Sequence, residues 1–201
     1  MNFLSIDCST DIGSLFIKVE NKTFSKVLQS DKSNNDLLMK QILDYFTKCD
    51  INIDDISNIF VNQGPGNFSG LRGSLALAKG ISLSKNLSLY GYDIFIWSCA
   101  SFFAKKDSIY SLIKFREKYF IKKFDKNLKS FSKMQEITLD EILKNYDNKF
   151  KVIPKNLIKY FDQKILKLNN LNIVELDHNL LEFLQLKGLL DEKFIKPLYI
   201  S

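Results

Sequence analysis

Histidine and cysteine are scarce in this chain of 201 residues. It contains a single histidine, His178, and three cysteines, Cys8, Cys49 and Cys99, which are far apart and form no C-x-x-C pair. Zinc sites and Ser-His or Cys-His catalysis depend heavily on these residue types, so we expect neither a histidine-based metal site nor a catalytic triad. We interpret the cysteines as free thiols in a reducing compartment, and His178 as a helix-start or surface residue.

Long apolar runs are also missing. No stretch of about 18 uncharged apolar residues occurs, and the first ten residues, MNFLSIDCST, have no basic region before an apolar one. We therefore expect no membrane span, no signal peptide and a cytoplasmic location. The 45% of apolar residues and 13% of aromatic ones are enough to build a packed core.

Charge is distributed unevenly along the chain. Residues 1–100 contain 9 Lys and Arg against 10 Asp and Glu, a formal charge of −1, whereas residues 101–201 contain 20 against 13, a charge of +7. A basic half could face nucleic acid. The general richness of the chain in lysine explains the same excess without any ligand, so both interpretations stay open.

The first half of the chain alternates between strand and helix patterns. NFLSIDCS, DIGSLFIKVE and KTFSKVLQS predict three antiparallel strands. SNNDLLMKQILDYFTKC predicts a helix capped by Asn34, Asn35 or Asp36, with an apolar arc of about 160° that is wider than one sheet contact needs. DISNIFVNQ predicts a fourth strand, which leads through a glycine loop into a second helix; a fifth strand, NLSLYGY, and a third helix, DIFIWSCASFFAK, follow. This order is typical of the ribonuclease-H-like unit.

The second half begins the same order again. SIYSLIKF, KYFIKKFD and KSFSKMQEI predict three strands, and Thr138 with Glu141 forms a capping box before a helix. KFKVIP and LNIVEL predict two more strands, separated by a short helix, and DHNLLEFLQLKGLL predicts a final helix. We therefore predict an α/β fold with two actin-like lobes, each a mixed sheet with helices. The predicted boundary gives lobes of residues 1–105 and 106–201.

The glycine loop matches neither of two known phosphate-binding patterns. A Walker loop needs a lysine where Leu71 stands, and the glycine spacing G-x-G-x-x-x-G departs from the dinucleotide fingerprint. We interpret Gly64, Pro65, Gly66 and Gly70 as a structural strand-to-helix turn, in which Gly64 and Gly66 permit positive φ angles. Backbone N–H groups after the turn would point at an anion or at an acceptor of another chain.

The helix after this loop combines a narrow polar stripe with many small residues. Arg72, Lys79 and Asn86 recur at intervals of seven, whereas Gly73, Ala76 and Gly80 keep much of the surface small. Glycine in a helix costs about 0.5–1 kcal/mol relative to alanine, which suggests close approach by another backbone. That backbone could belong to the protein's own sheet or to another chain.

These segments together resemble a known family. GPGNFSGLRGSLALAKGISLSKNLSLYGY is similar to the GPGSFTGLRIGLAxAKGLA segment of the TsaB (YeaZ) family, and FLSIDCSTDIGSLFI is similar to its IDTST opening. KSNNDLLMKQILDYF resembles its HSExLLPxI helix, and KPLYIS its final PxYLR. The resemblance covers about the first 95 residues specifically and the rest weakly.

The resemblance implies a non-catalytic, actin-like subunit in the synthesis of tRNA N6-threonylcarbamoyladenosine, without a cofactor or a bound metal. The implied partners are a TsaD-type catalytic subunit, a TsaE-type ATPase through the complex, and a second copy of the chain when it is alone. Contact with tRNA within the complex stays open. The expected interface lies on helices 36–49 and 71–85, whereas a charge change at Lys151 should leave it intact. Its predicted residues are Leu38, Ile42, Tyr45, Arg72, Ala76 and Lys79.

Two enzymatic alternatives are weaker. A peptidase would use Ser69 as its nucleophile, but the sequence contains only one histidine to activate it. A kinase or ATPase of the same fold would use Asp7 near the phosphates, but the second half has a single glycine, Gly188, for nucleotide-clamping turns. Asp7 with the following hydroxyl residues also suits a turn between strands. Ile94 and Ser98 stand where the catalytic relative has metal-binding histidines.

Overall fold

The computed structural model describes residues 1–29 and 37–199, which form two compact units. The predicted cap at Asn34, Asn35 or Asp36 lies outside the described residues. The first unit comprises Met1–Ile94 and Leu190–Ser201, and the second comprises Phe95–Leu189. None of the helices in the described part of the chain is long and apolar enough to cross a membrane.

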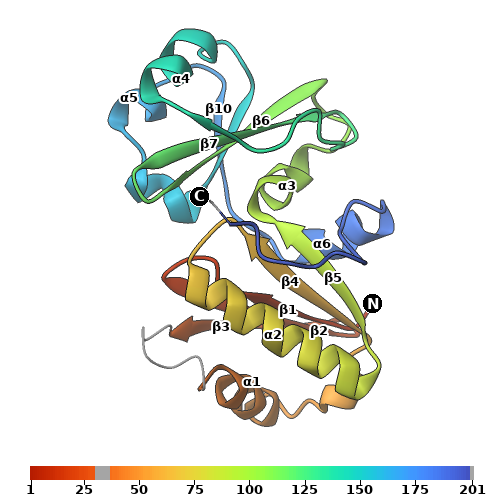
Figure 1. Cartoon of the computed structure of the whole chain (residues 1–201). Coiled ribbons are helices and arrows are strands. Elements are labelled where there is room, and N and C mark those ends of the chain that lie inside the picture. The colour runs from red at the N-terminus through yellow and green to blue at the C-terminus, as the bar shows by residue number, and fades with distance from the viewer. Residues whose placement is uncertain (30–36, 200–201) are drawn as a thin grey trace. The chain divides into compact units, whose positions relative to one another are not determined.

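The first unit is a five-stranded sheet with two long helices (Figure 1). Its elements are β1 (Phe3–Asp7), β2 (Ile12–Val19), β3 (Lys22–Gln29), α1 (Leu37–Lys48), β4 (Asn58–Gly64), α2 (Phe68–Lys85) and β5 (Ser88–Asp93), with a 3₁₀ turn at Ile53–Asp55. The sheet order is β3-β2-β1-β4-β5. The first three strands are antiparallel, whereas β4 runs parallel to both β1 and β5.

The core of the first unit lies between this sheet and its helices. In the central strand β1, alternate side chains point to opposite faces of the sheet. Leu4 and Ile6 belong to the apolar cluster that includes buried residues of α1 and α2. On the other face, the ring of Phe3 stacks on Phe16 at 5.6 Å and meets Phe60 edge-on at 4.9 Å. All five residues of β1 are buried, which suits its largely apolar sequence.

The second unit repeats the strand order with shorter helices. Its elements are α3 (Ile94–Cys99), β6 (Ser108–Phe115), β7 (Lys118–Asp125), β8 (Gln135–Ile137), α4 (Leu139–Asn145), β9 (Lys151–Pro154), a 3₁₀ helix (Lys155–Tyr160), α5 (Gln163–Leu166), β10 (Leu171–Val174) and α6 (Asn179–Leu186). The sheet order is β10-β9-β6-β7-β8. Here β6, β7 and β8 are antiparallel, and β9 runs parallel to β6 and β10. The predicted fold of two mixed-sheet units is confirmed.

The division of the chain differs from the predicted boundary near Lys105. The first unit ends at Ile94, and the C-terminal segment returns to it from Leu190. Backbone hydrogen bonds explain the return, because Gly91 and Asp191 exchange both of their N–H···O bonds, at 2.8 and 2.9 Å. The Leu198 N–H also donates to Gln63 O at 2.7 Å.

Lys151 is not suitable as the control position that was chosen from the sequence, because a charge change there would enter the interior of the second unit. Its side chain is fully buried in β9, where Nζ donates to the carbonyl oxygens of Tyr146, Asp147, Lys149 and Asn169 at 2.5–2.8 Å. Four acceptors replace the water that a charged ammonium group loses on burial. The lysine therefore ties the loop between α4 and β9 to the turn that precedes β10.

Candidate partner interface

The glycine loop joins β4 to α2 and packs against the turn after β1. Gly64 has φ of +106°, which is the left-handed conformation that the sequence predicted. Gly66 does not have a positive φ, and its requirement is instead steric: a β-carbon there would overlap the Ser9 carbonyl group. A β-carbon at Gly70 would likewise overlap the Cys8 carbonyl oxygen. The loop thus holds the start of α2 directly on the β1–β2 turn.

A buried polar cluster fixes the same turn. Asp7 Oδ1 accepts hydrogen bonds from Ser9 N–H at 2.8 Å and from Asn62 Nδ2 at 3.0 Å, and Asn62 Oδ1 accepts from Gly64 N–H at 2.8 Å. The predicted turn at Asp7 is confirmed by these contacts. Burial raises the pKa of the Asp7 carboxyl group, although the hydrogen bonds oppose the shift. The carboxylate is engaged in holding β1, β4 and the loop together.

Residues considered for catalysis occupy structural positions. Ser69 Oγ lies 3.2 Å from Asn67 Oδ1, to which it donates. His178 directly precedes α6 and packs on the Trp97 ring at 4.8 Å, and burial lowers its pKa to about 4. Ser98 is buried and shares a hydrogen bond with the Ser111 hydroxyl group at 2.8 Å. Among residues 1–29 and 37–199, no group of three or more His, Cys, Asp or Glu side chains is placed to hold a metal ion.

Helix α2 presents one side to the sheet and leaves the other exposed. Its buried side consists of Leu71, Ser74, Leu75, Ala78 and Ile81. Arg72, Ala76 and Lys79, three of the predicted interface residues, are exposed. The side chain of Leu83 is 83% exposed, and no described atom lies within 4 Å of a β-carbon built at Gly80. Packing within the described chain therefore does not explain the glycine at position 80.

Helix α1 requires a correction to the other half of the predicted interface. Leu38, Ile42 and Tyr45 are buried in the core of the first unit, and the Tyr45 hydroxyl group donates to Ser25 O on β3 at 2.6 Å. The wide apolar arc arises because α1 has apolar residues on its exposed side as well. Those residues, which sequence reasoning did not select, are Leu37, Met39 and Leu43, each 39–44% exposed.

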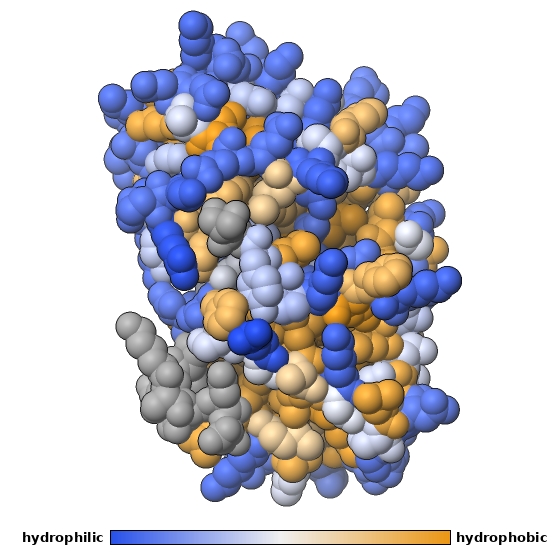
Figure 2. Space-filling model, in the orientation of Figure 1, coloured by the Kyte–Doolittle hydropathy of each residue, from blue (hydrophilic) through white to orange (hydrophobic). Residues whose placement is uncertain are grey.

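The exposed sides of these two helices define the surface that we call the helix face: Leu37, Met39 and Leu43 of α1 with Arg72, Ala76, Lys79, Gly80 and Leu83 of α2. Figure 2 shows hydrophobic side chains gathered over this part of the first unit. Figure 1 shows α1 and α2 on the same side of the sheet. Periodicity alone could not separate core from face on α1, because its buried and exposed apolar residues adjoin in one continuous arc, opposite the exposed Lys40, Asp44 and Thr47.

The C-terminal segment reaches the first turn of α2. Arg72 Nε donates to the Tyr199 hydroxyl group at 3.1 Å, and the Arg72 guanidinium group lies 4.4 Å from the centre of the Phe68 ring. The rings of Phe68 and Tyr199 are 5.1 Å apart, and both side chains are 48% exposed. Arg72 is therefore oriented by its own chain at the end of the helix face.

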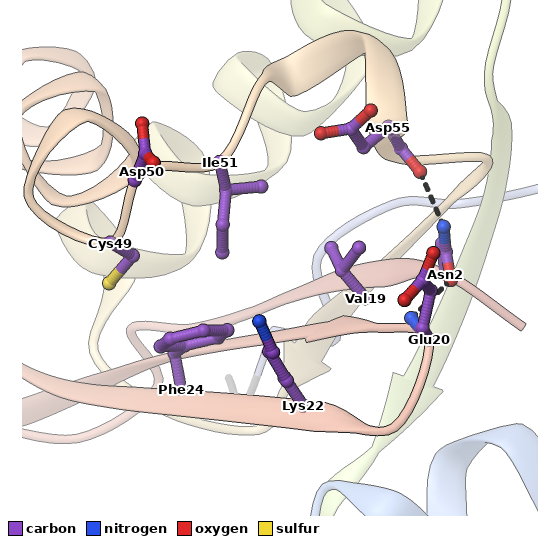
Figure 3. A pocket seen from close by; sticks show the side chains of 9 residues that line it. All are labelled: Asn2, Val19, Glu20, Lys22, Phe24, Cys49, Asp50, Ile51 and Asp55. Atoms are coloured by element: carbon purple, nitrogen blue, oxygen red, sulfur yellow. Dashed lines mark hydrogen bonds between the residues drawn. The ribbon is translucent and has the colours of Figure 1, made fainter.

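A separate pocket of about 220 Å³ lies in the first unit beside the end of α1 (Figure 3). Strand residues Val19, Lys22 and Phe24 line one side, and Cys49 and Ile51 line the other. Its rim is tied together where the Asn2 side chain donates to Asp55 O at 2.9 Å and accepts from Glu20 N–H at 2.8 Å. No pattern in the sequence indicated this pocket.

Comparison with known proteins supports the resemblance inferred from the motifs. The family model for TsaD, tRNA N6-adenosine threonylcarbamoyltransferase, matches residues 29–108. Two curated relatives are named tRNA threonylcarbamoyladenosine biosynthesis protein TsaB. The one from Buchnera aphidicola subsp. Baizongia pistaciae is 34% identical over 86 residues, and the one from Buchnera aphidicola subsp. Schizaphis graminum is 26% identical over 88 residues. The matches span 42% and 44% of this chain and only 38% and 42% of those relatives.

Solved structures match over the whole chain. A Pseudomonas aeruginosa protein described as having similarity to the peptidase YeaZ superposes with a TM-score of 0.73, at 14% identity, over 100% of this chain and 99% of its own. YeaZ from Pseudomonas aeruginosa superposes with a TM-score of 0.71, also at 14% identity, over 99% of each chain. These two likenesses concern the fold, and with the curated relatives they confirm the resemblance to the TsaB (YeaZ) family.

Proposed function

We propose that this TsaB-like chain is a non-catalytic subunit in tRNA N6-threonylcarbamoyladenosine synthesis, which binds a TsaD-type transferase through its helix face. A TsaE-type ATPase would join through the complex, and two copies of the chain would pair through the same face when the partner is absent. The names of the two curated relatives support the pathway. The protein would act by holding the transferase in its active form in the cytoplasm.

The helix face carries this proposal. Leu83, Leu43 and Leu37 expose apolar side chains on two neighbouring helices, and Gly80 and Ala76 would let another helix come close. Fully burying one leucine side chain is worth about 1.5–3 kcal/mol, so several of them can drive association. The charged groups Arg72 and Lys79 would lie at the rim, where they give orientation more than affinity.

The contacts of the candidate catalytic groups favour an accessory role. A phosphate-transferring enzyme would need Asp7 available to a metal ion or nucleotide, but this carboxyl group is 4% exposed and accepts hydrogen bonds from Ser9 and Asn62. A peptidase would need a base to activate Ser69, and the single histidine of the sequence, His178, packs on the Trp97 ring.

The proposal is tested with charged substitutions on the helix face. Ala76→Glu and Leu83→Glu each place a carboxylate where a partner helix would bury it, which typically costs several kcal/mol. We expect each variant to keep the melting temperature of the parent and to lose both self-association and binding to a TsaD-type subunit by at least about 100-fold. Sedimentation of each variant, alone and with that subunit, measures both.

Gln163→Glu is the matched control, because it also adds one carboxylate to an exposed helix position, in α5 of the second unit. It should retain both assemblies. Leu38 is not suitable as a test position, since a charge there would enter the core. Full retention of both assemblies by Ala76→Glu and Leu83→Glu would exclude the helix face as the partner site.

A further inference from the structure

We propose that the second unit binds a single-stranded nucleic acid segment on a surface made of one exposed aromatic ring and the lysines of the same strand and loop. This surface, which we call the lysine–phenylalanine patch, consists of Lys123 on β7 with Lys126, Lys129, Phe131 and Lys133 of the following loop. It lies outside the helix face and does not depend on the partner proposed above.

Phe131 is an exposed ring on a well-anchored loop. Its side chain is 63% exposed. Its backbone N–H donates to Lys123 O at 3.0 Å, and the loop is further closed where Asp125 N–H donates to Lys129 O at 3.0 Å. Leu128, in the middle of the loop, is buried. The loop backbone is therefore fixed by hydrogen bonds while the Phe131 ring is exposed to solvent. A side chain on which a base stacks needs both properties.

One lysine ammonium group lies over this ring, and further lysines occur in the same loop. Lys123 Nζ lies 5.0 Å from the centre of the Phe131 ring and 5.5 Å from that of Tyr110, its cross-strand partner on β6. Lys129, Phe131 and Lys133 occupy alternate positions along the loop. Where aromatic rings and lysines alternate, a base can stack on a ring and the neighbouring phosphate can pair with a lysine ammonium group.

The positive charge of the patch is not neutralised by neighbouring carboxylates. Within residues 1–29 and 37–199, the side chains of Lys126, Lys129 and Lys133 make no ion pair. Asp125, the acidic residue closest in sequence, uses Oδ1 to accept the N–H groups of Asn127 and Lys129, both at 2.8 Å. Glu136, beyond the loop, pairs with Lys118 at 2.9 Å.

The charge of the whole unit favours the same ligand. Residues 95–189 contain 18 Lys and Arg against 11 Asp and Glu, a formal charge of +7, whereas the remaining residues contain 11 against 12. A positive field concentrates polyanions near the surface, and releasing their counterions supplies affinity. An acidic protein segment would satisfy the charge but would leave the exposed Phe131 ring without a stacking partner.

The direct test is binding of fluorescein-labelled U12 and dT12 oligonucleotides to the full chain, followed by fluorescence anisotropy between 50 and 200 mM salt. Phe131→Ala should weaken binding about fivefold or more, because stacking of one base is worth about 1–3 kcal/mol. Phe131→Trp, which keeps an aromatic ring at this position, should retain the affinity of the parent. Replacing Lys126, Lys129 and Lys133 together by glutamine should reduce the slope of log affinity against log salt by about 2. The U12 and dT12 arms distinguish RNA from DNA as the source.

Two control variants are matched to these changes. Replacing Lys144, Lys159 and Lys164 by glutamine removes the same charge from exposed positions elsewhere on the unit, and Tyr160→Ala removes a 38% exposed ring that a lysine also covers. Both controls should bind like the parent. The proposal is overturned if neither oligonucleotide binds, if the controls lose as much affinity as the patch variants, or if polyglutamate competes as well as U12.

Discussion

The two units have the same strand order and opposite surface chemistry. Each places its first strand in the centre, two antiparallel strands on one side and two parallel strands on the other. After the fourth strand, however, the first unit has the 18-residue helix α2, whereas the second has a six-residue 3₁₀ helix and the four-residue α5. One topology can thus carry two kinds of surface.

The contrast in the helices explains the contrast in the surfaces. A long helix on a sheet buries one side and must leave another exposed, and in α2 that exposed side combines Ala76, Gly80 and Leu83 with the charged Arg72 and Lys79. The short helical turns of the second unit offer no comparable face. Its exposed surface comes largely from strands and loops that are rich in lysine. This contrast supports the two proposals above, of a protein partner on the first unit and a nucleic acid on the second.

The largest effect on stability should come from replacing Lys151, the buried lysine of the second unit. This test compares the stabilisation of the two sheets, because the second relies on a buried charged side chain. Lys151→Met removes the side-chain donor of Asp147 O, Lys149 O and Asn169 O, whereas Tyr146 O still accepts from Lys149 N–H at 3.0 Å. Each buried acceptor left without a donor costs about 1–3 kcal/mol, so the three together should cost about 3 kcal/mol or more. We expect that loss of unfolding free energy in urea, with faster hydrogen exchange at Val152 and Ile153. The exposed Lys149→Met is the control and should change stability little.

The next largest effect is a difference in stability between alanine substitutions at two glycines of the first unit. Gly66→Ala forces a methyl group into the Ser9 carbonyl group, so the backbone must move at a cost of about 3 kcal/mol. Gly80→Ala meets no described atom within 4 Å and should instead stabilise α2 by about 0.5–1 kcal/mol. Urea unfolding of both variants measures the difference. Equal stability of the two would contradict the role assigned to the loop.

Sequence patterns predicted the repeated order of strands because alternation and turn residues are local signals. They also predicted the capping box at Thr138, whose two hydrogen bonds involve residues three apart. They did not predict the return of the C-terminal segment to β5 through Asp191, since a backbone pairing leaves no side-chain pattern. The core role of Leu38 was missed for another reason: the apolar arc of α1 is wider than the part that the sheet covers, and periodicity does not show which part of the arc is covered.

A third test concerns how the unfolding free energy depends on pH. The first strand of the first sheet, β1, ends in Asp7, whereas the first strand of the second sheet, β6, contains no carboxylate. Burial raises the pKa of Asp7 above its usual value of 3.8, so the folded state holds this proton more tightly than the unfolded state. Stability from this group is therefore present at low pH and lost as pH rises through the folded-state pKa. A tenfold difference in proton affinity between the two states corresponds to about 1.4 kcal/mol of unfolding free energy.

Asp7→Asn removes this titration while its amide oxygen can still accept from Ser9 and Asn62. We expect the variant to be more stable than the parent at pH 7, with the difference disappearing as pH falls toward 4. Urea unfolding at intervals between pH 4 and 8 follows this change. A constant difference across that range would contradict a raised pKa at Asp7.

The smallest effect is the loss of stability when the residue before a helix is replaced by alanine. It should differ between α4 in the second unit and α2 in the first. Thr138 Oγ1 accepts from Glu141 N–H at 3.3 Å, and Glu141 Oε2 accepts from Thr138 N–H at 2.8 Å. Within the described residues, the Asn67 side chain caps no backbone amide of α2, whose start the glycine loop already holds. Thr138→Ala should therefore cost about 1 kcal/mol, and Asn67→Ala less than about 0.5 kcal/mol.

The pH dependence of the Thr138 variant completes this test. The backbone N–H of Thr138 and, to a smaller extent, its hydroxyl group lower the pKa of Glu141 by hydrogen bonding, and only the hydroxyl contribution is lost in Thr138→Ala. The stability that this group contributes is present above its usual value of 4.5 and is lost as pH falls through the lower folded-state pKa. The gap between parent and Thr138→Ala in urea unfolding should accordingly narrow below pH 4.5, whereas the Asn67→Ala gap should not change. If Asn67→Ala costs as much as Thr138→Ala, side-chain capping starts both helices, and the difference drawn between the two units at this point is wrong.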